Sequence, residues 1–142
     1  MKSQFITELD LELCPGSDGI WTLKSPLVYY SDLLKYQIVV PHSYPAVTFY
    51  TDLSSVPRIP LIYEWWGNKA HREAVIHDYL YRRNSIPVVS FMMANRVMLE
   101  AMIVREKPVY IRQPIFIGVC LGGYPSYHRK DVETPLTKAE IK

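Results

Sequence analysis

The sequence predicts an α+β protein in which a small, mainly antiparallel β-sheet is packed by an antiparallel helix pair. Apolar and polar residues alternate with the period of a strand before residue 51, whereas helical spacing follows residue 68. The chain has 142 residues, 49% of them hydrophobic, which is enough to build one core. We therefore expect a single α+β domain over residues 1–130 and a charged C-terminal tail over residues 131–142.

The expected strands lie in the first 50 residues and are separated by turn-forming residues. Residues 7–13 alternate apolar with polar, and a Pro/Gly-rich turn follows at residues 15–19. Residues 20–23 and 27–30 form two short strands separated by Pro26, and residues 36–40 form another that stops at Pro41. A last strand is expected over residues 47–50.

Two helical patterns follow. Asn68 is a good N-cap for a helix that runs to about Arg83. Ser85 and Pro87 are suited to open a second helix that ends near Lys107. Because the connection is short, the two helices should be antiparallel neighbours. Residues 109–124 fit either a third helix or a strand, since a proline and a glycine weaken the helical pattern.

Composition excludes several classes of protein. The net charge is +2 and the basic residues are scattered, so we expect no nucleic-acid partner. The longest apolar run near the C-terminus, residues 115–123, is too short to span a bilayer, and no apolar core of signal-peptide length follows Met1. Cys14 and Cys120 lack metal-binding spacing and are expected to be free thiols.

The candidate catalytic residues lie on the first predicted helix. His77 and Tyr81 are four residues apart and share one face, while Asp78 lies about 100° around the helix axis. Imidazole titrates near neutral pH, so His77 is suited to take a proton from water. Asn95 on the facing helix is suited to hold the second ring nitrogen of His77. Tyr81 is suited to orient either group.

A cation site is the second chemical prediction. Asp78 and Asp52 together supply oxygen ligands of the kind that a hard divalent cation such as calcium prefers. The residues alone also permit a structural role, in which a buried His, Asp and Tyr cross-link two helices and a loop. Asp52 has a local alternative as well, because residues 51–55 can form side-chain to backbone bonds that shape a turn.

Two segments resemble a known family. Residues 51–58 read Thr51-Asp52-Leu53-Ser54-Ser55-Val56-Pro57-Arg58, and residues 74–82 read Ala74-Val75-Ile76-His77-Asp78-Tyr79-Leu80-Tyr81-Arg82. Together they resemble the phage-associated domain of unknown function numbered 1353, over roughly residues 20–125. In that family a Thr-Asp-Gly-Ala-Ser-Val-Pro-Arg-like segment precedes a His-Asp-x-x-Tyr helix and an Ala-Asp pair. Here Leu53 replaces the glycine and Asn95 replaces the second aspartate. The resemblance implies a phage or prophage source.

The helix pair is also similar to that of the secreted phospholipases. Those enzymes use His-Asp-x-x-Tyr on one helix and an Asp on an antiparallel helix, with calcium and a water activated by the histidine. His77, Asp78 and Tyr81 match this pattern, with Asn95 in place of the Asp. The chain lacks a Gly-rich calcium loop just before the helix and a Cys beside His77. The similarity concerns the site and not the whole fold.

Three functions are compatible with these observations, and the residues slightly favour the first over its two alternatives. The first is a hydrolase-like protein in which His77 activates water to cleave an ester or amide of the host envelope. The second is a virion or assembly component that contacts other phage proteins, with a purely structural polar cluster. The third is a small anti-defence protein that binds and blocks a host factor. In each case we expect the protein in the host cytoplasm or the virion. The oligomeric state stays open.

Overall fold

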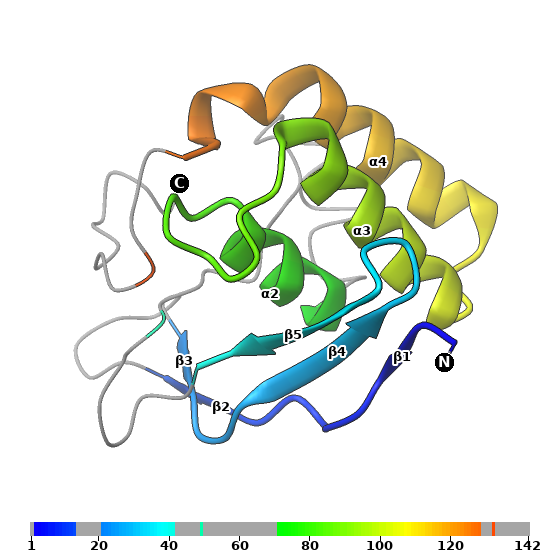
Figure 1. Ribbon diagram of the computed structural model, residues 1–142. Coiled ribbons are helices and arrows are strands. Elements are labelled where there is room, and N and C mark those ends of the chain that lie inside the picture. Colours follow the sequence, from blue (N-terminus) through cyan, green and yellow to red (C-terminus); the bar gives the residue numbers. More distant parts are fainter. Residues whose placement is uncertain (1, 14–20, 42–48, 50–70, 129–131, 133–142) are drawn as a thin grey trace.

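The described part of the chain forms two antiparallel β-sheets and three successive helices, and the larger sheet packs against the helices (Figure 1). The computed structural model describes residues 2–13, 21–41, 49, 71–128 and 132. In chain order its elements are β1 (Gln4–Phe5), β2 (Leu11–Leu13), β3 (Trp21–Leu23), β4 (Leu27–Ser31), β5 (Tyr36–Val40), α2 (His71–Leu80), α3 (Phe91–Val104), α4 (Val109–Gly122) and the 3-10 helix η1 (Tyr124–Ser126). The α+β class predicted from the sequence is confirmed.

The larger sheet has the order β1-β4-β5, and the smaller one pairs β2 with β3. Every pairing is antiparallel, and Tyr29 of β4 lies opposite Ile38 of β5. Along β4 the side chains of Leu27, Tyr29 and Ser31 are buried, while those between them are half-buried. This two-residue period follows from the alternation of side chains across a pleated strand, and it turns one face of the sheet towards the helices.

The helices pack in sequence order, with α2 and α3 against the larger sheet and α4 against α3. α2 contacts β5 and α3, and α3 contacts β4 and α4. Figure 1 shows α4 on the side of α3 that faces away from the sheet. Residue contacts between α2 and α3 pair His77 with Asn95 and Tyr81 with Phe91, so the two helices run antiparallel as predicted.

Glu100 fixes α3 to the sheet. One carboxylate oxygen accepts hydrogen bonds from the Tyr29 hydroxyl at 2.7 Å and the Ser31 hydroxyl at 2.8 Å, and the other accepts from the Leu33 amide at 2.9 Å. Three donors from one strand and the turn that follows it therefore converge on one side chain of α3. Charge-assisted bonds of this kind are stronger than neutral ones.

The N-terminal segment differs from the expected continuous strand over residues 7–13. β1 ends at Phe5, and β2 does not begin until Leu11. Between them the Thr7 hydroxyl donates to the Pro26 carbonyl and accepts from the Val28 amide, both at 2.9 Å. The side chain of Thr7 thus takes over hydrogen bonds that a backbone ladder would otherwise make, and the strand is interrupted there.

The second predicted helix begins later than expected. The N-cap of α3 is Ser90, whose hydroxyl accepts from the Met93 amide at 3.1 Å. Ser85, the expected cap, instead donates its hydroxyl to the Pro87 carbonyl. Both serines have suitable chemistry for a cap. A proline, however, disfavours helical backbone angles at the residue before it, here Ile86, so the helix starts only after Pro87.

The segment that follows Lys107, for which the sequence fitted either a helix or a strand, is helical. Ile111, Ile115 and Val119 are buried at four-residue spacing, and they form an apolar cluster with Met98 and Met102. This packing against α3 outweighs the unfavourable effects of a proline and a glycine inside the helix. Beyond η1, within the residues expected to form a charged tail, Val132 is buried and its amide donates to the Asn84 side chain at 2.7 Å.

Candidate functional site

The site is built around one face of α2. His77 lies in its last turn, and Tyr81 continues the same backbone hydrogen-bonding pattern, because its amide donates to the His77 carbonyl at 3.0 Å. The two ring centroids are 4.0 Å apart. The four-residue spacing thus places imidazole and phenol against each other, as helix geometry requires.

Asn95 of α3 joins these two side chains. Its amide oxygen Oδ1 accepts a hydrogen bond from the Tyr81 hydroxyl at 2.7 Å and lies 2.8 Å from His77 Nε2. Because an amide oxygen can only accept, Nε2 must carry the proton. In the neutral ring the remaining nitrogen, Nδ1, is then the basic one. His77, Tyr81 and Asn95 therefore converge, as the spacing and the short connection between the helices predicted.

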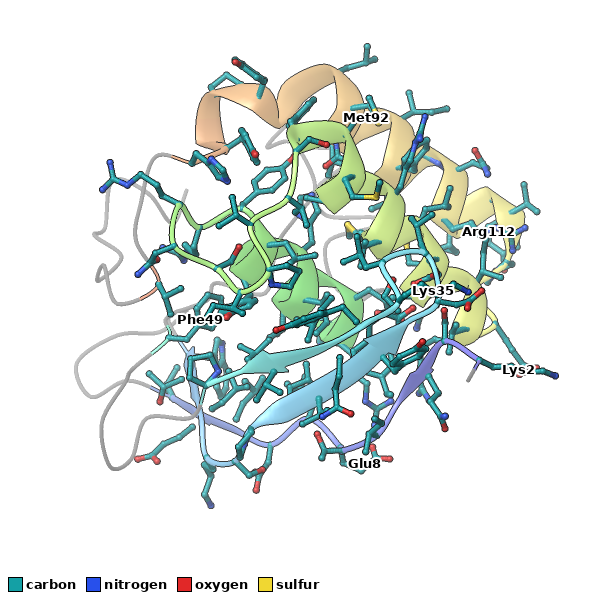
Figure 2. All side chains as sticks on the ribbon, viewed as in Figure 1. Lys2, Glu8, Lys35, Phe49, Met92 and Arg112 are labelled. Carbon is teal, nitrogen blue, oxygen red and sulfur yellow. The ribbon has the colours of Figure 1, made fainter. Side chains whose placement is uncertain are left out.

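The amide group of Asn95 extends the cluster to α4. Asn95 Nδ2 lies 3.8 Å from the Cys120 sulfur, which in turn lies 3.8 Å from the Met92 sulfur. Figure 2 shows Met92 on α3, beside α4. Cys120 is a free, half-buried thiol, and burial raises its pKa. Sequence reasoning did not place it here, because nothing local to residue 120 indicates a partner 25 residues away.

Burial dominates the electrostatics of the cluster. His77 is 1% exposed and Asn95 is fully buried. Burial lowers the pKa of His77 to about 4, although the hydrogen bond to Asn95 opposes this change. Burial also raises the pKa of Tyr81. At neutral pH the cluster is consequently uncharged, which is the state that a low-dielectric environment favours.

A carboxyl group that the sequence reading missed lies one turn before His77 on the same face of α2. Glu73 is almost completely buried, and its Oε1 has no hydrogen-bond partner in the described part of the chain. Burial raises the pKa of Glu73. His71 is half-buried and has a buried Nε2 that is likewise unpaired within the described residues. The spacing of Glu73, His77 and Tyr81, each four residues apart, is the signal that could have revealed Glu73.

The predicted cation ligands are only partly placed. Asp78 lies on α2 and is half-buried, and its charge contributes to the raised pKa of Tyr81. Asp52 lies outside the described residues. Across the described ranges, no three His, Cys, Asp or Glu side chains are grouped as a metal site would need. The pairing of Asp52 with Asp78 therefore stays a prediction.

The end of α4 closes over Tyr81. A methyl group at Gly123 would lie 2.4 Å from the Tyr81 hydroxyl oxygen and 2.6 Å from the Val119 carbonyl oxygen. Both separations are far below ordinary contact distances, and the second involves backbone that cannot rotate away. A side chain at position 123 would therefore disturb the hydrogen bond between Tyr81 and Asn95.

We expect Gly123→Ala to lower the free energy of unfolding by about 1–3 kcal/mol, because overpacking forces the backbone to shift. Urea denaturation would measure the change. The matched control is Gly122→Ala, since Gly122 is exposed at the end of the same helix. There alanine should be neutral or slightly stabilising. Equal effects of the two substitutions would contradict the close contact at Gly123.

The fold and site together define a small α+β protein with a buried histidine–asparagine–tyrosine cluster between two antiparallel helices. The family model described as "Protein of unknown function (DUF1353)" matches residues 21–119, and the chain belongs to this family. The match runs from β3 into α4 and includes His77, Tyr81 and Asn95, but it ends before Cys120 and Gly123. No curated protein and no solved structure matches the chain. Among the described helices, none is both long and apolar enough to cross a membrane.

Proposed function

We propose that this protein acts by binding other phage proteins, as a virion or assembly component, and that the His77 cluster is a structural cross-link between α2 and α3. The observation that carries the proposal is the burial of His77, whose Nε2 is occupied by Asn95. A general base must come within hydrogen-bond reach of the proton that it removes. A side chain that is 1% exposed offers almost no surface for that approach.

The surface of α4 supports the same proposal. Several large apolar side chains of this helix are exposed to solvent, among them Val109, Tyr110, Ile117 and Leu121. Exposed apolar side chains scattered singly are ordinary, but a group of them on one element marks an interaction surface. The phage context itself rests on the motif resemblance described above.

A second candidate is the hydrolase-like function, which one observation favours. The hydrogen bond from His77 Nε2 to Asn95 makes Nδ1 the basic nitrogen, and the Tyr81 hydroxyl holds the same amide oxygen. This is the arrangement that a histidine base needs in order to be oriented. In this candidate Asp78 and Asp52 hold a divalent cation such as calcium, and the substrate is an ester or amide of the host envelope.

The two candidates differ in the expected behaviour of three variants. The wild-type protein, His77→Ala, Asp78→Asn and Asn95→Asp should be tested for hydrolysis of phospholipid and peptidoglycan, with and without calcium, and for thermal stability. If the cluster is a structural cross-link, the wild-type protein shows no turnover and no calcium-dependent change in melting temperature. His77→Ala then affects stability alone.

Turnover that is lost in a folded His77→Ala variant would overturn the proposal in favour of the hydrolase. In that case Asn95→Asp should keep or increase turnover, because a carboxylate stabilises the imidazolium that forms during proton transfer. Asp78→Asn should weaken the calcium dependence. The proposal predicts instead that no variant differs from the wild-type protein in either assay of hydrolysis.

A further inference from the structure

The outward side of α4 carries a continuous apolar stripe. Tyr110, Ile117 and Leu121 are separated by seven and four residues, so they lie on one side of the helix. They are 68%, 51% and 83% exposed. Tyr124, also exposed, follows the helix after Gly123. The opposite side of α4 is already used, since Ile111, Ile115 and Val119 pack with the methionines of α3.

The stripe is uncharged. The sequence of α4 contains one charged residue, Arg112, which lies about 200° around the helix from Tyr110. Its guanidinium donates to the Lys107 carbonyl at 2.9 Å, where it holds the connection between α3 and α4. Figure 2 places Arg112 near the start of α4, away from Met92. Helices that lie on anionic membranes carry Lys or Arg along their polar side, and α4 offers no such row.

A neutral apolar stripe is complementary to itself. When two identical surfaces meet around a two-fold axis, each residue faces the same set of residues from the other copy. Like charges would then oppose each other, but the stripe has none.

We propose that two copies of this chain pair through the outer stripe of α4, with the two-fold axis close to Ile117. The exposed surface of Tyr110, Ile117, Leu121 and Tyr124 is on the order of 500 Å² per copy, less than the about 800 Å² per partner of a standard stable interface. The pair should therefore be specific but reversible, with a dissociation constant on the order of 1–100 µM. The proposal rests on the binding function in one respect: it assigns the exposed surface of α4, given above as support for contacts with other phage proteins, to a second copy of this chain.

Sedimentation equilibrium of the full chain across this concentration range tests the pairing. We expect a monomer–dimer equilibrium in the wild-type protein and only monomer in the double variant Ile117→Glu with Leu121→Glu. The matched control is Val88→Glu, because Val88 is 64% exposed but lies on the connection between α2 and α3. This control should dimerise like the wild-type protein. Far-UV circular dichroism checks that each variant is folded.

A measurement on the wild-type protein keeps the proposal testable if the double variant does not fold. In a mixture of isotope-labelled and unlabelled chains, filtered NMR should show contacts between copies at the methyl groups of Ile117 and Leu121. A wild-type protein that stays monomeric at the highest concentration would overturn the proposal. So would a dimer that survives the double substitution. Monomer that binds vesicles of phosphatidylglycerol and phosphatidylcholine would assign the stripe to a membrane surface instead.

These outcomes are separate from the test of the proposed function. Hydrolysis dependent on His77 would reject the structural role of the cluster and leave the dimer intact. A monomeric protein without hydrolytic activity would reject the pairing alone.

Discussion

Replacement of Asn95 by alanine should lower the free energy of unfolding by about 3–5 kcal/mol. The side chain is fully buried, and its oxygen accepts from both the Tyr81 hydroxyl and His77 Nε2. The substitution leaves two buried donors unpaired, each costing about 1–3 kcal/mol, and it leaves a small cavity. Urea denaturation followed by circular dichroism would measure the loss.

The neighbouring residue supplies the control. Arg96 is exposed on the same helix, so Arg96→Ala should change stability by no more than about 0.5 kcal/mol. A double-mutant cycle with Tyr81→Phe adds a second check. Because phenylalanine has no hydroxyl to leave unpaired, the combined loss should be smaller than the sum of the single losses. Additive losses, or an effect of Asn95→Ala as small as that of the control, would show that the cluster does not hold α2 to α3.

The cluster could be predicted because its geometry is mostly local. The spacing of His77 and Tyr81 fixes their shared face once the segment is helical, whatever the rest of the fold does. Asn95 required one further inference, that a short connection makes α3 the antiparallel neighbour of α2. The wrong N-cap predicted for α3 did not disturb this result. Asn95 lies inside the helix, and its side of the helix is the same whether the cap is Ser85 or Ser90.

The remaining contacts of the site depend on tertiary packing. Cys120 and Gly123 lie in the segment whose helical and extended patterns were equally supported, and only the apolar surface of α3 decides between them. The interruption of the first strand by Thr7 has the same origin, since its partners Pro26 and Val28 lie about 20 residues away. A single sequence carries no local record of such partners.

The stability of the protein should decrease as the pH falls from 6.5 to about 4, and His77 should be the main cause. Burial lowers the pKa of His77 from 6.5 in an exposed chain to about 4 in the folded protein. The unfolded chain therefore binds a proton at a higher pH than the folded protein does. Acidification through this window then favours unfolding, by on the order of 3 kcal/mol at its lower end. Above pH 6.5 this contribution to stability is complete.

The comparison with His77→Gln isolates this effect, because glutamine does not titrate and retains an amide donor for Asn95. Unfolding free energies measured at several pH values should fall less steeply in this variant than in the wild-type protein. Glu73 acts in the opposite direction: burial raises its pKa, so the folded protein holds its proton to a higher pH than the unfolded chain. That contribution is common to both proteins and cancels in the difference.

His71→Gln removes a less buried histidine whose pKa is lowered for the same reason, so it should reduce the pH dependence by a smaller amount. If the two histidine variants changed the pH dependence equally, or if His77→Gln left it as steep as in the wild-type protein, burial of a neutral His77 could not be its source.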